Sequence, residues 1–154
     1  MSRTPLIRAL LIGCLATVLS GCGDIAAKLP KQTGHERAAF VHRIETACTA
    51  RTSDLHRLKS PRTRSAYLAS FAARRLVEAE FQNSVGQIVP PKGALQPFQR
   101  LTHAAQARVD AVDRFHEAVL ARKLGEGRAA FAETRSDSLV IAREAKVLGA
   151  SCPA

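Results

Sequence analysis

Aromatic residues are scarce in this chain of 154 residues, which has no tryptophan, a single tyrosine (Tyr67) and six phenylalanines. A surface that stacks sugars or nucleic-acid bases needs exposed aromatic rings. The composition therefore argues against a stacking platform for either ligand. Nucleic acid is not expected as a partner.

Sequence motifs of common catalytic sites are also missing. The chain has no HExxH, no glycine-rich phosphate loop, no nucleophile elbow and no SxxK. Asp113 and His116, and likewise His42 and Glu45, stand three residues apart as in di-metal bundles, but the matching Glu-x-x-His segments are absent. The sequence therefore predicts a protein that is not an enzyme and has no metal site and no cofactor.

The start of the chain carries the pattern of an export signal. Arg3 and Arg8 precede an uncharged run, Ala9–Gly21, that is shorter than the roughly 20 residues needed to span a bilayer. The run leads into Leu19-Ser20-Gly21-Cys22, which resembles a bacterial lipobox: an apolar residue, two small residues and a thiol that accepts diacylglycerol.

This resemblance implies a lipoprotein signal peptide, residues 1–21, that is removed between Gly21 and Cys22. Acyl chains on Cys22 would then hold the mature protein at the extracytoplasmic face of the cell membrane. We interpret residues 22–34 as a lipidated flexible tether and residues 35–154 as one folded domain. An ordinary secretory signal with a chance cysteine is the alternative.

Two of the four cysteines are left for the folded domain. Cys14 leaves with the signal and Cys22 carries lipid, so Cys48 and Cys152 remain in an oxidising compartment, where we predict that they form a disulfide. Two free thiols, with Cys48 as a catalytic nucleophile, are the alternative. The sequence places no histidine to activate that thiol.

Apolar residues recur in steps of three and four along the domain, as in the stripe of Phe40, Ile44 and Cys48. This spacing predicts helices over residues 35–58, 62–88 and 95–124, and a fourth that ends at Leu148 with Gly149 as its C-cap. Four amphipathic helices with short connections predict an all-α fold, the up-and-down four-helix bundle.

The predicted disulfide places a constraint on the register of these helices. Cys48 lies about 15 Å from the end of the first helix, whereas the fourth helix rises about 30 Å before Cys152. Either the first helix is displaced along the bundle axis, with residues 59–64 spanning the offset, or the tail after Gly149 folds back. We expect the displacement.

Several short features are shared with a known group of proteins. They are Cys48 on the first helix, the Val89-Pro90-Pro91 connection, alanine- and arginine-rich third and fourth helices, and the closing segment Leu148–Cys152. In these features residues 36–152 resemble uncharacterised small helical lipoproteins of high-GC Gram-positive bacteria. The resemblance implies a helical envelope domain with a helix-to-tail disulfide and brings no catalytic residue.

The mature protein is strongly basic. Removing Arg3 and Arg8 leaves 21 basic residues against 13 acidic ones, a net charge of about +8. Basic exported domains meet anionic lipid headgroups or wall polymers. We predict that such a surface is bound by the arginines of the second helix and its start, Arg62, Arg64, Arg74 and Arg75. A merely solvated basic face is the alternative.

These observations predict a membrane-tethered, non-enzymatic binding or structural module of the cell envelope, whose partner is an envelope protein or an anionic polymer. The alternative is a carrier of a small ligand or metal in the bundle core. A sealed core would exclude the carrier and an open polar pocket would favour it. The side chains that decide between the two are Phe71, Phe98, Phe115 and Phe131.

Overall fold

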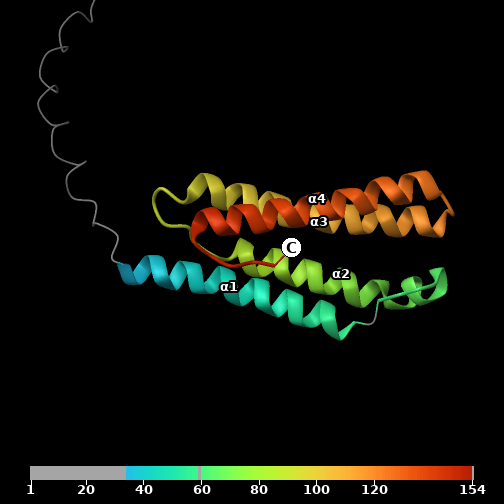
Figure 1. Cartoon of the computed structure of the whole chain (residues 1–154), viewed down its shortest axis with the longest axis horizontal. Helices are drawn as coiled ribbons and strands as arrows, with labels where there is room; N and C mark the ends of the chain where they lie inside the picture. Colours follow the sequence, from blue (N-terminus) through green and yellow to red (C-terminus); the bar gives the residue numbers. More distant parts are fainter. Residues whose placement is uncertain (1–33, 59, 154) are drawn as a thin grey trace, which may run out of the picture. The chain divides into compact units, whose positions relative to one another are not determined.

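The computed structural model describes residues 34–58 and 60–153, which contain four α-helices (Figure 1). They are α1 (Gly34–Arg57), α2 (Arg64–Gly86), α3 (Leu95–Leu120) and α4 (Leu124–Leu148). The predicted all-α four-helix bundle is confirmed. The signal peptide, with Gly21 and Cys22, lies outside the described residues, as does the tether up to Gly34, which begins α1.

The helix ends follow local sequence signals. The Thr63 hydroxyl accepts a hydrogen bond from the Ala66 N–H at 3.2 Å and so caps the start of α2. Gly149 ends α4 with φ of 89°, a left-handed conformation that glycine adopts without strain. Gly149 is therefore the C-cap, as predicted.

The helices pack in the order of the chain: α1 on α2, α2 on α3, and α3 most extensively on α4. In Figure 1, α1 and α2 form one layer and α3 and α4 form the other. No extensive contact joins α1 to α4. Helix packing therefore leaves the seam between α1 and α4 open.

The first helix is displaced along the bundle, as the register argument predicts. At the end of α1, the Leu58 carbonyl accepts a hydrogen bond from Arg74 at 3.5 Å, although Arg74 lies well inside α2. The stretch from Arg64 to Arg74, about 15 Å of helix, extends beyond α1 (Figure 1). Residues 60–63 span this offset without helical structure.

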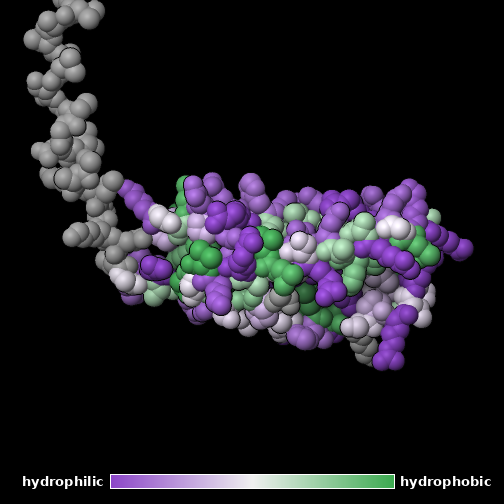
Figure 2. Space-filling view, turned by 45° about the horizontal axis from the view of Figure 1, so that its top comes forward, coloured by the Kyte–Doolittle hydropathy of each residue, from purple (hydrophilic) through white to green (hydrophobic). Residues whose placement is uncertain are grey.

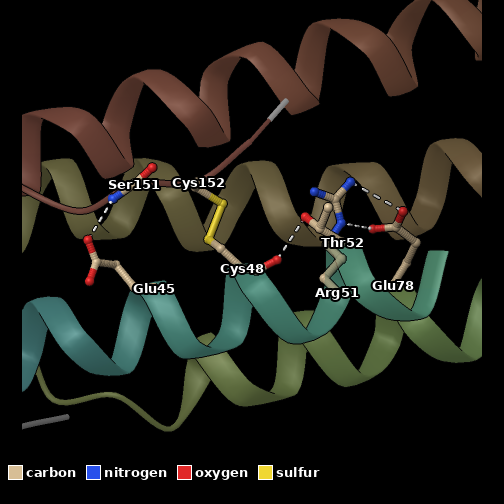
Figure 3. The surroundings of a disulfide bond; sticks show 7 residues. All are labelled: Glu45, Cys48, Arg51, Thr52, Glu78, Ser151 and Cys152. Atoms are coloured by element: carbon tan, nitrogen blue, oxygen red, sulfur yellow. Dashed lines mark hydrogen bonds and ion pairs between the residues drawn. A yellow bond between two sulfur atoms is a disulfide. The ribbon is translucent and has the colours of Figure 1, made fainter. Parts of the chain in front are cut away.

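The tail after α4 also folds back, so the displacement alone does not account for the disulfide. The Ser151 N–H donates a hydrogen bond to Glu45 at 3.1 Å, and Cys152 is bonded to Cys48 with their Cα atoms 5.2 Å apart (Figure 3). Glu45 precedes Cys48 in α1, so the tail runs in the direction of α1. It fills one part of the open seam.

Side-chain packing divides the domain into three zones along its axis. The first is an apolar core near the start of α1, formed mainly by Phe40, Ile44, Cys48, Phe81, Val85, Phe98, Leu101, Ile141, Ala145, Leu148 and Cys152. Next comes a group that we call the polar layer, Arg51, Glu78, Arg108, Thr134 and Ser138. The third zone is an aromatic cluster, Tyr67, Phe71, Phe115, His116 and Phe131.

Two apolar residues that the helical spacing places inside are exposed. Leu76 is 57% exposed, because Val77, Phe81 and Val85 face the core in steps of four and leave Leu76 to one side. Phe131 is 53% exposed, because α1 ends before it could cover this part of α4. Apolar spacing alone therefore does not place these two residues in the core.

Candidate functional site: a basic cavity at the open end of the bundle

A cavity of about 950 Å³ opens beyond the end of α1, where only three helices remain. Its walls come from the α1–α2 connection, the start of α2, the end of α3 and the start of α4. We call it the end cavity. Its place follows from the displacement of α1, which leaves the other three helices uncovered at this end.

The floor of the end cavity is apolar. It is formed by Tyr67, Phe115, Ala118, Val119, Leu124 and Phe131. Tyr67 meets Phe115 edge to face with ring centroids 4.9 Å apart. At the mouth, Leu124 is 77% exposed and Phe131 is 53% exposed. Figure 2 shows a green apolar area bordered by purple hydrophilic side chains at the end of the domain that the α3–α4 turn forms.

The rim of the end cavity is cationic. Six basic side chains line it, Arg62, Arg64, Arg74, Arg122, Lys123 and Arg128, and no carboxylate does. Within the described part of the chain, the side chains of Arg62, Arg122 and Arg128 make no hydrogen bond or ion pair. These three cations are therefore available to an anionic ligand.

Other cations of the rim have partners. Lys123 is paired with Glu126 at 2.9 Å. Arg64 donates hydrogen bonds to the carbonyls of Val119 and Leu120, at 3.0 and 3.2 Å. These carbonyls lie in the last turn of α3, so Arg64 ties the start of α2 to the end of α3 and fixes one side of the cavity.

Three of the four arginines predicted to bind an anionic surface are brought together at this rim: Arg62, Arg64 and Arg74. Arg75 is not part of it. Its guanidinium forms two hydrogen bonds with the carboxylate of Asp113, at 2.8 and 3.0 Å, on an exposed face between α2 and α3. The neighbouring carboxylate raises the pKa of Arg75, which stays charged but already has a partner.

Sequence analysis missed the other half of the rim, Arg122, Lys123 and Arg128. A signal was present, because these residues form a basic run around the turn between the last two helices. In an up-and-down bundle this turn lies at the same end as the start of the second helix. The fold therefore brings the two basic groups to the same end of the bundle.

Arg122 is held in an unusual backbone conformation. Its φ is 57°, in the left-handed region that disfavours side chains with a Cβ. The N–H groups of Arg122 and Lys123 donate to the carbonyls of Val119 and Ala118, at 3.3 and 2.9 Å, as in a helix-ending motif whose left-handed residue is usually glycine. An arginine at this position costs about 1–2 kcal/mol of backbone strain and places a cation at the rim.

Tyr67 adds a hydroxyl to the wall. This hydroxyl is buried and has no hydrogen-bond partner among the described residues. Burial raises the pKa of Tyr67 to about 12, so the group remains a neutral phenol at physiological pH. An unpaired buried hydroxyl is costly, at about 1–3 kcal/mol, and a ligand that accepts its hydrogen bond would recover part of that.

The acid–histidine pairs weighed as metal ligands are used otherwise. His116 stacks on Phe71 with ring centroids 3.6 Å apart, while Asp113 is paired with Arg75. Across residues 34–58 and 60–153, no group of three or more histidine, cysteine or carboxylate side chains could hold a metal ion. Nor is any helix of these residues long and apolar enough to cross a membrane.

A scan against protein-family models found no match to this chain, and searches of curated proteins and of solved structures found none either. The chemistry of the end cavity is therefore the basis on which function is inferred.

Proposed function

We propose that this protein is a membrane-tethered, extracytoplasmic binding protein, without enzymatic activity, that holds a single-chain lipid with an anionic headgroup in the end cavity. The carrying observation is the combination of an apolar floor with a rim of six cations and no carboxylate. An acyl chain would lie on the floor and the acid group at the rim.

Charge complementarity favours an anionic ligand over a neutral one. Three rim arginines, Arg62, Arg122 and Arg128, have no competing partner among the residues described, and each is worth roughly 1 kcal/mol toward an anionic headgroup. A neutral apolar ligand would fill the floor and leave these charges unused. A small polar anion would use the charges and leave the apolar floor wet.

Size also fits a lipid chain. Pockets for small molecules and cofactors hold about 300–1,000 Å³ and are mostly apolar with a few placed polar groups. The end cavity, at about 950 Å³, is at the upper end of this range. Its exposed apolar mouth, at Leu124 and Phe131, would let a chain enter from a membrane or micelle.

The proposed anchor on Cys22 would keep the cavity close to its ligand. A tether of about a dozen residues holds a domain near the lipid surface at an effective concentration in the millimolar range. Even a modest affinity would then be enough to load the cavity. The ligand would lie in the end cavity, which Phe115 and Phe131 line, and not in the apolar core that contains Phe98, so this proposal differs from a carrier that uses the bundle core.

The test is a titration with oleate, followed by the fluorescence of Tyr67. Tyr67 is the single tyrosine and there is no tryptophan, so the signal comes from the cavity wall alone. We use the full chain with Cys22→Ala, which carries no acyl group of its own. Saturable binding of oleate, and binding at least about tenfold weaker of the uncharged oleyl alcohol, are expected.

Matched charge reversals locate the site. Arg62→Glu and Arg128→Glu should weaken oleate binding about fivefold or more each, whereas Arg75→Glu, outside the cavity, should leave it unchanged. Equal effects of all three would mean that the domain binds anionic surfaces through its overall charge. Absence of saturable oleate binding would overturn the proposal.

A further inference from the structure

A second pocket, of about 490 Å³, lies in the seam between α1 and α4, beside the polar layer. We call it the side pocket. Arg51 of α1, Arg108 of α3 and Arg135 of α4 line it, and Pro153 of the folded-back tail lies at its edge. It is the part of the open seam that the tail does not fill.

The polar layer beside this pocket contains more positive than negative charge. Glu78 accepts hydrogen bonds from Arg51 at 2.8 and 3.3 Å, and its carboxylate also lies 2.9 Å from Nε of Arg108 (Figure 3 shows the Arg51 side). The side chains of Arg51, Arg108 and Glu78 are 4%, 15% and 3% exposed. Two buried guanidinium groups thus share one buried carboxylate.

The other titratable groups near the layer do not remove this excess. His56 and Arg135 line the pocket and add no negative charge, and no carboxylate lines it. Asp137 of α4 attracts Arg108 electrostatically, but among the residues described it makes no hydrogen bond or ion pair with that guanidinium. Burial lowers the pKa of Arg108, even with Glu78 in contact.

Buried charge of one sign is costly unless a partner neutralises it. Arg51, Arg108 and Glu78 lie next to the side pocket, which offers room for a neutralising anion. The side chain of Arg135, which makes no hydrogen bond or ion pair with the residues described, lies at the same opening. Nη1 of Arg108 donates hydrogen bonds to the Thr134 carbonyl and the Ser138 hydroxyl, which hold this guanidinium at the wall but bring no negative charge.

We propose that the side pocket is a binding site for a small free oxyanion of the phosphate or sulfate type, which neutralises Arg51 and Arg108 and also contacts Arg135. A bidentate oxyanion matches the geometry of guanidinium groups. The site is separate from the end cavity and does not rest on the function proposed for it, although Phe131 borders both.

Thermal unfolding of the full chain in phosphate, against chloride at the same ionic strength, tests this site. The Tm should rise by about 5 °C when inorganic phosphate reaches ten times its Kd. In Arg108→Met the layer holds one arginine and one glutamate, so this variant should lose the phosphate response. An equal Tm of the unmodified chain in both salts would overturn the proposal.

A pair of surface variants keeps the test valid should Arg108→Met fail to fold. Arg135→Glu and Arg128→Glu make the same charge change two turns apart on α4, but only Arg135 lines the side pocket. Arg135→Glu should weaken the phosphate response at least fivefold, and Arg128→Glu should keep it. The same response in both variants would overturn the site.

Oleate distinguishes the two sites from each other. With the end cavity saturated by oleate, phosphate should still raise the Tm. Loss of the phosphate response under oleate would mean that one site takes both anions, which would overturn the separate oxyanion site. Failure of oleate to bind bears on the proposed function alone, since the phosphate measurement needs no oleate.

Discussion

Arg122 has a left-handed backbone conformation that a residue with a side chain disfavours. Gly149 ends α4 with the same left-handed helix-ending motif that Arg122 forms after α3, at φ of 89° and 57° respectively. Glycine is the residue that fits this conformation without strain. An arginine is therefore not needed to end α3, and its side chain lines the end cavity.

Replacing Arg122 by glycine should make the protein more stable and a weaker binder. Relief of strain, less the entropy of an added glycine, should raise the free energy of unfolding by about 0.5–1 kcal/mol. The lost cation should weaken oleate binding about fivefold. Chemical denaturation and oleate titration measure the two effects. A destabilised Arg122→Gly would show that the left-handed arginine is unstrained.

Tyr67 should make stability fall in alkaline solution. Its pKa is about 12 in the folded protein against an ordinary value of 10.0, so the folded state keeps the phenol proton longer than the unfolded state does. This contribution is fully present below pH 10 and is lost as the pH rises toward 12.

Phenolate absorbance measures this titration for Tyr67 alone, because the chain has no other tyrosine and no tryptophan. Tyr67→Phe should remove the component of alkaline destabilisation that begins near pH 10. A titration midpoint close to 10 would contradict the burial of the hydroxyl.

Single residues mark the limits of what sequence alone reveals. Arg51 follows Cys48 by three residues, so the helical spacing puts it on the stripe of α1 that is buried. This spacing could not identify Glu78 as the partner of Arg51, because the two residues lie on different helices whose register the sequence does not determine. Arg75 was assigned to an anion-binding surface for the same reason, since Asp113 reaches it from α3.

Elements were easier to predict than contacts. Apolar period and proline locate the helices to within a few residues, although Gly125 and Gly127, whose residue type suggests a turn, lie in α4. The cysteine pair also indicated that α1 is displaced. It did not reveal that the tail turns back as well, because Gly149 ends a helix without setting the direction of the chain that follows. The end cavity follows from the displacement of α1, whereas the folded-back tail borders the side pocket.

The tail depends on its disulfide, so removing the bond should loosen the seam between α1 and α4. Cys48 and Cys152 are 104 residues apart, and closing a loop of this length contributes up to about 4.7 kcal/mol in the chain-entropy model. The double variant Cys48→Ala and Cys152→Ala should lower the Tm markedly.

The phosphate response of the side pocket should weaken in the same variant, because Pro153 borders that pocket. Alkylation of the oxidised protein should find neither Cys48 nor Cys152 reactive. Two reactive thiols would contradict the bond.

At the scale of the whole molecule, the proposed location at the membrane depends on Cys22, which lies outside the described part of the chain. Cys22→Ala should abolish labelling by a radioactive fatty acid and either release the domain or leave an uncleaved precursor. Metabolic labelling followed by membrane fractionation measures both. Unchanged membrane retention of a chain whose signal has been removed would contradict the lipobox interpretation.

The polar layer sets a boundary for local unfolding of the domain. The contiguous apolar core ends at this layer and does not continue into the open end, where the mouth of the end cavity is exposed. Local opening then has a natural boundary, and the open end can unfold while the core stays intact. Backbone amides in Phe81–Gly86 and Phe98–Ala105 should exchange with deuterium only through global unfolding. Those of Arg64–Ser70 should exchange far sooner, and a bound ligand should slow them selectively.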